Sequence, residues 1–402
     1  MIPLTSQPFV ARESTPGWIN PKLANRIPEL DGLRGLAILL VLILHYAFET
    51  AVIHLKGDWQ HALLMFRLSW SGVDLFFVLS GFLIGGILID AKDTDNYYST
   101  FYLRRFYRIA PLYIILMLTF LIGEYGIGPN AAPPLKEMFN SDTVPFWAYP
   151  LFLQNVLGTL HRSFGAGWTG PTWSLAVEEQ FYLLLPFAIR RLSDKGLIKF
   201  TVGTILFAPA LRMILTHLGV TNFANYTLLP CRGDSLGLGL LVAMACRNQH
   251  AWTWLSAHRK LIFAAFLILG FGLLVWTVRD VELGYTWTAA FYTSLLLLVV
   301  VKPGRIERGV FRNVVFVKFG TIAYGVYLFH VGVLRLYHYA FFGAYPSVQN
   351  WSTLFATILA LFTVVTLAEL SWRFFEKPLI MWGRLRYQYR TVVGPVNDPR
   401  HG

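Results

Sequence analysis

The sequence predicts an all-α polytopic membrane protein, with about ten transmembrane helices around a central polar cavity and both termini in the cytoplasm. Three observations predict this fold class: a high apolar content, ten apolar windows of membrane-spanning length, and a one-sided distribution of positive charge. Hydrophobic residues make up 55% of the 402 residues, and charged residues only 14%. Soluble domains carry roughly 25% charged residues, so this composition excludes an ordinary soluble protein.

The apolar windows have about 17–22 residues, the length that a helix needs to cross the hydrocarbon core. The sixth window is short and rich in glycine, and residues 145–157 are too short to span, which predicts an interfacial or re-entrant piece. No signal peptide is expected, because the first 30 residues lack an apolar h-region before a small-residue cleavage site. The predicted spans are 33–50, 72–89, 108–126, 173–190, 198–216, 233–246, 260–277, 284–301, 319–338 and 351–372.

The positive charges alternate with these spans. Segments on the side of both termini hold 25 of the 34 lysines and arginines, whereas the opposite loops hold seven. Excess Lys and Arg marks the cytoplasmic side, so both termini are predicted to be cytoplasmic. The net charge of +12 then reflects membrane topology, and no nucleic-acid partner is expected. The predicted domains are a cytoplasmic tail at 1–28, a transmembrane domain at 29–380 and a cytoplasmic tail at 381–402.

Several ionisable residues fall inside the apolar spans. Arg34 lies at the cytoplasmic edge of the first span, and His45 lies eleven residues further on, about 16 Å deeper. Each has an ordinary interpretation, as a snorkelling arginine or as a histidine bonded to neighbouring backbone. Charged residues within spans tend to face the bundle interior and mark a pathway. The set predicts a hydrated central cavity, and its other members are Asp74, Glu178, Glu179, Asp234 and His330.

Glu178 and Glu179 are adjacent, so on a helix they point about 100° apart. At most one of them is expected to face the same cavity as His45, and the other could pair with an arginine such as Arg212. Trp173, one of three tryptophans in or next to the longest outer segment, could stack on the apolar face of a sugar. Tryptophans also gather at membrane interfaces without touching any substrate.

The stretch FYLRRFYRIAPLY places Arg104, Arg105 and Arg108 on the predicted cytoplasmic side. It can be read as an ordinary positive-inside loop or as a phosphate site, because arginine offers paired donors that match phosphate oxygens. Arg105 and Arg108 are three apart and would share a helical face. Histidine suits general-base catalysis near neutral pH. The layout predicts an anionic donor at the inner face and transfer to an acceptor outside.

Seven pieces of the sequence occur in a fixed order. They are LDGLRGLAILLVLILH, GVDLFFVLSGFLI, FYLRRFYRIAPLY, PTWSLAVEEQFYLLLP, RGDSLGLGLL, AYGVYLFH and FFEKP. In these pieces the chain resembles the acyltransferase-3 family of integral-membrane O-acyltransferases, from about residue 29 to 380. The resemblance implies a ten-helix transmembrane acyltransferase. Some members of the family carry an appended esterase-like domain; this sequence ends about 25 residues after FFEKP, so the stand-alone type is expected.

The resemblance also assigns residues and partners. The family's R-x10-H pair falls on Arg34 and His45, and its R-x-x-R motif falls on Arg105 and Arg108. It implies transfer of an acyl group, most often acetyl from acetyl-CoA, to a hydroxyl of an exopolysaccharide or lipopolysaccharide unit outside the bacterial inner membrane. The implied partners are acyl-CoA, a carbohydrate or lipid-linked glycan acceptor and membrane lipid. No metal is expected, and the oligomeric state stays open.

These considerations give a set of candidate site residues. The expected catalytic residues are His45, Glu178 and Arg34. The residues expected to bind the CoA donor are Arg104, Arg105 and Arg108. The residues expected to bind the acceptor are Asp74, Trp173, Glu179, Asp234 and His330.

Several alternatives stay open at this point. The acyl group could be succinyl or longer, and transfer could be direct or through an acyl-histidine. The acceptor could be a small molecule such as a macrolide. A transporter for a lipid-linked glycan would also need polar residues at mid-membrane, and a non-catalytic membrane scaffold would tolerate the loss of His45.

Overall fold

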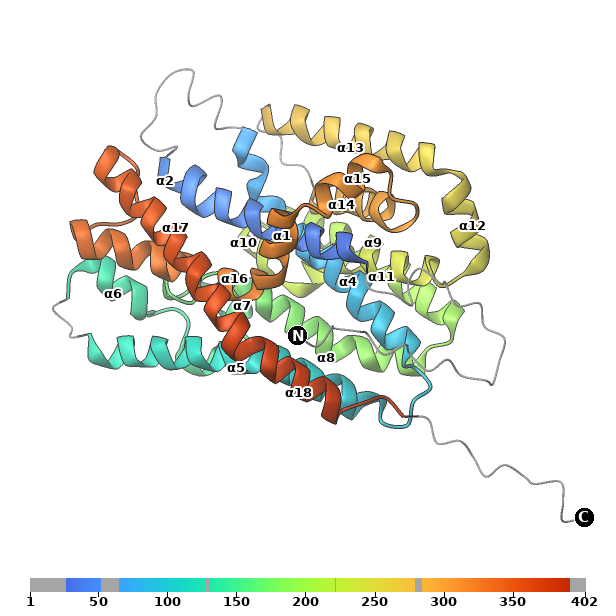
Figure 1. Cartoon of the computed structure of the whole chain (residues 1–402), viewed down its shortest axis with the longest axis horizontal. Helices are drawn as coiled ribbons and strands as arrows, with labels where there is room; N and C mark the ends of the chain where they lie inside the picture. Colours follow the sequence, from blue (N-terminus) through green and yellow to red (C-terminus); the bar gives the residue numbers. More distant parts are fainter. Residues whose placement is uncertain (1–26, 52–64, 128–130, 221, 279–283, 391–402) are drawn as a thin grey trace, which may run out of the picture.

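The structure is a computed structural model that describes residues 27–51, 65–127, 131–220, 222–278 and 284–390. Within these ranges all the regular secondary structure is helical and no strand forms, as the sequence predicts. The helices form one bundle in which α13 and α5 run along opposite edges of the view, with α1 and α4 between them (Figure 1).

The helix bounds are as follows. The long helices are α1 (Pro28–Ile43), α4 (Gly72–Asp90), α5 (Tyr97–Gly126), α8 (Thr172–Arg191), α9 (Asp194–His217), α11 (Leu229–Ala245), α13 (Arg259–Val278), α14 (Tyr285–Val300), α16 (Val314–Phe342) and α17 (Trp351–Ser371). The short ones are η1 (Leu44–Phe48), α2 (Glu49–Ala51), η2 (Met65–Ser71), α6 (Pro133–Phe139), η3 (Phe146–Ala148), α7 (Gln154–His161), α10 (Asn222–Thr227), α12 (Gln249–Ala257), α15 (Arg305–Phe311), η4 (Trp372–Glu376) and α18 (Lys377–Arg386).

Within the described ranges, seven helices are long and apolar enough to cross a membrane, or up to nine if each of two bent pairs counts as one span. The bends are 71° between α12 and α13 and 103° between α14 and α15. Helix α8 covers the fourth predicted span but is not among the nine. Glu178 and Glu179 lower its hydropathy, although its exposed side chains include Leu183, Leu184 and Phe187. Ten spans and cytoplasmic termini therefore stay predictions.

Some boundaries differ from those predicted. Helix α5 begins at Tyr97, eleven residues before the predicted third span, because the arginine-rich stretch continues the helix instead of forming a loop. Residues 145–157 form only η3 and the first turn of α7, which confirms that this apolar piece does not span as a helix. The predicted boundary at residue 380 falls inside α18. The tail at 1–28 lies almost entirely outside the described residues.

Helices α1 and α16 pack closely through glycines at their contact. A Cβ added at Gly35 would lie 1.9 Å from the carbonyl oxygen of Phe316, and one at Gly320 would lie 1.8 Å from that of Asp31. Both obstacles are backbone atoms, so no side-chain rotation relieves the clash. Small residues let helix backbones approach in membrane proteins. Helix α16, which carries His330, is therefore in direct contact with α1, the helix that leads directly into the turn with His45.

Gly35→Ala is expected to destabilise the fold by on the order of 1–3 kcal/mol, since the added methyl group forces α1 away from α16. A thermal unfolding assay in detergent measures this as a lower Tm. The control is Gly203→Ala in α9, where an added Cβ meets nothing within 4 Å and alanine is the better helix former. Equal unfolding temperatures for Gly35→Ala and the wild type would contradict the close packing.

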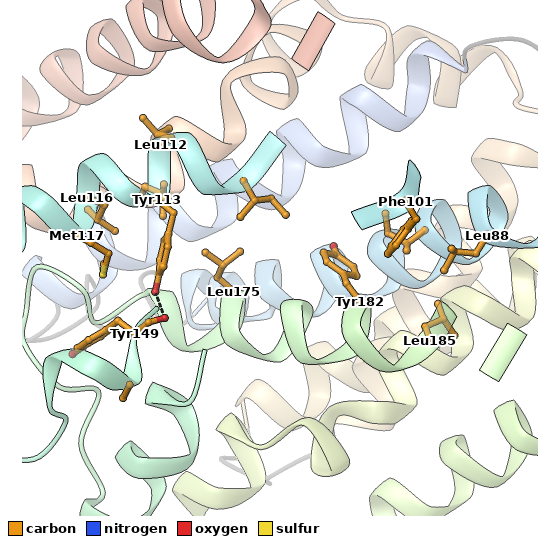
Figure 2. Close-up of a cluster of buried hydrophobic side chains, with 14 of the residues drawn as sticks. Leu88, Phe101, Leu112, Tyr113, Leu116, Met117, Tyr149, Leu175, Tyr182 and Leu185 are labelled. Carbon is orange, nitrogen blue, oxygen red and sulfur yellow. Dashed lines mark hydrogen bonds between the residues drawn. The ribbon is translucent and has the colours of Figure 1, made fainter. Parts of the chain in front are cut away.

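A cluster of buried hydrophobic side chains joins α5 to α8 and positions the ionisable residues of both helices (Figure 2). Leu116 of α5 and Leu175 and Leu185 of α8 belong to it. The hydroxyl of Tyr113 donates a hydrogen bond to the carbonyl oxygen of Tyr149 at 3.0 Å, which ties the segment after η3 to α5. The arginines of α5 and the glutamates of α8 thus lie on helices that share one core.

Candidate active site

His45 and His330 lie against each other at the contact between η1 and α16. Their ring centroids are 4.8 Å apart, with the ring planes at 77°. The sequence placed the two histidines at similar depth, and the close packing of α1 on α16 brings them together. His45 lies in η1, a single π-helical turn that directly follows α1. Such turns occur often at functional sites.

Both imidazole rings are held by the same kind of bond. Nδ1 of His45 lies 2.9 Å from the carbonyl oxygen of Val41, and Nδ1 of His330 lies 2.7 Å from that of Tyr327. A carbonyl oxygen only accepts, so each Nδ1 carries the hydrogen and, in a neutral ring, each Nε2 has a free lone pair. His45 is half-buried and His330 fully buried. Neither Nε2 makes a hydrogen bond within the described ranges.

Glu178 is held in a network with two hydroxyl groups. Ser80 donates to its Oε1 at 2.6 Å, and the hydroxyl of Tyr182 lies 3.0 Å from both its Oε2 and the Ser80 oxygen. At Nδ1 of His45 the partner is the Val41 carbonyl and not this carboxylate. A direct orienting bond from Glu178 to His45 is thus not formed in this state, and its catalytic role stays a prediction.

Glu179 differs from its neighbour, as the 100° offset on a helix predicts. Its carboxylate is largely buried, and its Oε1 has no hydrogen-bond partner among the described residues. Its carboxyl group lies within Coulombic range of Arg105 of α5. Glu179 therefore faces the contact between α8 and α5, while Glu178 is bonded to α4 through Ser80.

Three arginines lie close enough for their charges to act on one another: Arg34 of α1 with Arg105 and Arg108 of α5. Arg34 forms an ion pair with Asp31 at 3.3 Å. The guanidinium group of Arg105 lies 5.6 Å from the ring centre of Tyr182. Both α5 arginines are half-buried, and within the described ranges neither forms an ion pair. This arginine cluster (Arg34, Arg105 and Arg108) can bind an anion.

Arg104 lies outside this cluster. Its Nε donates to the carbonyl oxygen of Tyr387 at 2.6 Å, and its guanidinium group lies 5.0 Å from the ring centre of Tyr389. The side chain fastens the segment after α18 to α5. The sequence predicts that Arg104 binds the CoA donor together with Arg105 and Arg108. The helix turns Arg104 and Arg105 about 100° apart and gives them different partners, and the predicted CoA contact of Arg104 stays a prediction.

Asp74 and Asp234 both form buried ion pairs. Arg232 Nη2 donates to Asp74 at 2.5 Å, and Arg212 Nη2 donates to Asp234 at 2.8 Å. Both carboxylates are fully buried. Arg212 thus pairs with Asp234 and not with a glutamate, the alternative considered from the sequence. Arg232 was missed because it precedes the predicted sixth span, although it stands two residues before Asp234 in RGDSLG.

Trp173 lies inside an aromatic cluster. Its ring is only 7% exposed and lies 4.4 Å from the ring of Tyr226 and 6.4 Å from that of Phe77, measured between centroids. The next residue, Ser174, forms a 2.5 Å hydrogen bond with the hydroxyl of Tyr327. Trp173 therefore packs beside the helix turn that carries His330, and its stacking on a sugar stays a prediction.

The arrangement combines two imidazoles with free Nε2 atoms, an arginine cluster and a bonded carboxylate. The sequence profile described as "Acyltransferase domain" matches residues 27–370, from the start of α1 to the last turn of α17. The chain belongs to the acyltransferase-3 family. All the helices that carry the histidine pair, the two glutamates and the arginine cluster lie within the matched residues.

Curated relatives include bacterial O-acetyltransferases. Peptidoglycan O-acetyltransferase OatA of Listeria monocytogenes is 26% identical over 378 residues, which cover 90% of this chain and 57% of that protein. O-acetyltransferase OatA of Staphylococcus aureus is 26% identical over 373 residues, 88% of this chain and 57% of that protein. The chain thus spans less than two thirds of the length of these relatives. No solved structure matches it.

Proposed function

We propose that the chain is a membrane O-acyltransferase that moves an acetyl group from cytosolic acetyl-CoA to a hydroxyl of a carbohydrate acceptor outside the bacterial inner membrane. The observation that carries this proposal is the arginine cluster, in which Arg105 and Arg108 are half-buried without an ion pair. The carboxyl groups of Glu178 and Glu179 lie within Coulombic range of these arginines but form no ion pair with them within the described ranges. Both guanidinium groups therefore keep donors for an anion, and the guanidinium fork matches the geometry of the CoA phosphates.

The proposed topology has ten spans, with α8 as the additional one and the arginine cluster near the cytoplasmic face. The apolar exposed face of α8 supports this count. Arg34 and His45 are eleven residues apart, which corresponds to about 16 Å along the helix. The extended pantetheine arm of CoA would cover this distance and bring the thioester to the histidine pair.

His45 would act as the general base. Its Nε2 takes the proton of the acceptor hydroxyl as the oxygen attacks the thioester carbon. The carbon–sulfur bond then breaks, and the CoA thiolate takes the proton back from Nε2. The Nδ1 bond to Val41 holds the ring in place throughout. Glu178 would offset the positive charge that forms on His45, and a route through an acyl-histidine uses the same atom.

The named relatives support a carbohydrate acceptor, since one of them is a peptidoglycan O-acetyltransferase. Mass spectrometry of surface glycans with and without the gene tests this part of the proposal. The expected result is the loss of an acetyl increment from one glycan when the gene is removed. If a succinyl increment is lost instead, the group transferred is succinyl and not acetyl. If the glycans are unchanged and an acetyl ester is lost from a small molecule, the acceptor is a small molecule and not a glycan.

The double substitution Arg105→Gln and Arg108→Gln is expected to raise the KM for acetyl-CoA about 10- to 100-fold and to change kcat little. The reason is that two charge-assisted bonds to phosphate are lost while the reacting groups stay in place. Release of the CoA thiol by the purified protein, measured over a range of acetyl-CoA concentrations, gives both constants.

Arg104→Gln is the matched control, because its guanidinium group is bound to the segment after α18. It is expected to leave the KM for acetyl-CoA within about twofold of wild type, since it removes no phosphate contact. An unchanged KM in the double variant would show that Arg105 and Arg108 do not bind acetyl-CoA. Their charges would then only mark the cytoplasmic side of the membrane.

A further inference from the structure

The Nε2 atom of His330 is a buried hydrogen-bond acceptor without a partner within the described ranges. Leaving such an atom unsatisfied costs free energy, so a native case needs an explanation. Another buried histidine of the same helix shows the usual solution. His338 bonds Thr357 through Nε2 at 2.9 Å and accepts from the backbone of Ser347 through Nδ1 at 3.4 Å. His330 is the exception, and it lies beside the proposed base.

The position of the His330 ring is fixed by its surroundings. Nδ1 is bonded to the carbonyl oxygen of Tyr327, so the ring cannot turn Nε2 elsewhere without breaking that bond. The hydroxyl of Tyr46 donates to the carbonyl oxygen of His330 itself at 2.8 Å, which ties η1 to α16 at this point. His45 and His330 thus offer two free lone pairs from neighbouring, immobilised rings.

The chemistry of the two substrates shows which of them can satisfy His330. An acetyl thioester offers a methyl group, a carbonyl oxygen and a sulfur atom beside the reacting carbon, and none of these donates a hydrogen bond. The first N–H of acetyl-CoA belongs to the pantetheine amide, two carbons beyond the sulfur and therefore further from the reacting carbon than a group next to the attacking hydroxyl. The acceptor offers its reacting hydroxyl, which goes to His45. A second donor on the acceptor, next to that hydroxyl, would meet the neighbouring lone pair of His330.

We infer that His330 determines acceptor specificity, with its Nε2 accepting a hydrogen bond from a second O–H or N–H group beside the reacting hydroxyl. The preferred acceptors are therefore vicinal diols and hydroxy-amides, the arrangements found around sugar rings. The inference rests on the proposed function, because it takes His45 as the base. No bond breaks at the second group; it orients the acceptor so that the reacting oxygen faces the thioester.

The test compares an acceptor with its analogue that lacks the second donor. Methyl glycosides of glucose and of N-acetylglucosamine are offered with acetyl-CoA, and the acetylated position is mapped by NMR. The monodeoxy glycoside that lacks the neighbouring hydroxyl, or the deoxy analogue that lacks the acetamido group, is then assayed by thiol release. For the wild type, kcat/KM is expected to be about tenfold lower on that analogue than on the complete glycoside. The reason is that the buried Nε2 of His330 is then left without a hydrogen-bond donor.

The variants separate a specificity role from a structural one. His330→Phe keeps a ring but has no atom that accepts a hydrogen bond. Its kcat/KM values for the complete glycoside and for the deoxy analogue are therefore expected to differ by no more than about twofold. His330→Leu gives the same comparison should the Phe variant fail to fold, and His330→Asn is expected to regain part of the preference through its amide oxygen. His338→Phe, the matched control, is expected to keep the wild-type ratio.

A tenfold preference that persists in His330→Phe or His330→Leu would overturn the inference and leave the proposed function intact. A preference lost equally in His338→Phe would assign the effect to helix packing and would also overturn it. Failure of the wild type to acetylate either glycoside would contradict the proposed carbohydrate acceptor itself.

Discussion

Replacing His45 with alanine is expected to lower kcat for acetyl transfer about 10³-fold. General-base catalysis by a positioned side chain contributes typically 10²–10⁴-fold. His45 is half-buried, and its Nε2 makes no hydrogen bond within the described ranges. The KM for acetyl-CoA is expected to stay near wild type, because the arginine cluster is unchanged. The measurement is transfer of label from acetyl-CoA to a methyl glycoside by purified protein.

His258→Ala is the matched control for this substitution. Its Nδ1 bonds the carbonyl oxygen of Trp254, four residues earlier, at 2.8 Å, so it makes the same local bond as His45. It lies at the end of α12, outside the histidine pair and the arginine cluster, and its loss is expected to leave transfer unchanged. Near-wild-type transfer by His45→Ala would assign the base to another group and would reject the proposed mechanism.

Asp74→Ala is expected to lower the stability of the fold by about 3–5 kcal/mol, the cost of leaving a buried charge without its partner. The pair between Asp74 and Arg232 is fully buried, and Ser235 also donates to the same carboxylate at 3.2 Å. Without the carboxylate, the guanidinium group of Arg232 loses its ion-pair partner and stays buried beside the rings of Phe77 and Tyr285. Thermal unfolding in detergent measures the effect as a lower Tm.

Asp90→Ala provides the comparison. Asp90 pairs with Arg247 through two bonds of 2.6 Å, but its side chain is 46% exposed, so its removal is expected to cost at most about 1 kcal/mol. Equal losses of stability in the two variants would show that burial of the Asp74 pair does not matter. Asp74→Asn, which keeps an oxygen acceptor, separates stability from acceptor binding: an unchanged Tm with a raised acceptor KM would favour the sequence-based role.

The fold was largely predictable, because the length and hydropathy of a helix are local properties. Windows placed from composition coincide with α4 and α9 to within four residues. The start of α5 was misplaced because arginines were read as a loop, whereas inside the bundle they extend the helix. The count of spans is limited by α8, whose half-buried glutamates lower its hydropathy even though its exposed face is apolar.

The sequence names candidate residues for the site but not the groups that each of them contacts, and their roles stay predictions. The depth of His45 and His330 follows from counting residues along two helices, but their contact depends on glycines that let α1 approach α16. Asp74 similarly looks like a pathway carboxylate at the start of a span. Its ion-pair partner, Arg232, stands 158 residues later, and no local pattern links the two. Ionisable residues in spans therefore indicate a polar interior without saying which of them are free to react.

The most direct test of the proposed function is acetyl transfer across a sealed proteoliposome. Labelled acetyl-CoA is placed on one side and a methyl glycoside on the other, and the orientation of the protein is read from protease access to a tag at its C-terminus. Label is expected on the glycoside only when acetyl-CoA is on the side of the C-terminus, and not with His45→Ala. Transfer that requires donor and acceptor on the same side would contradict the account.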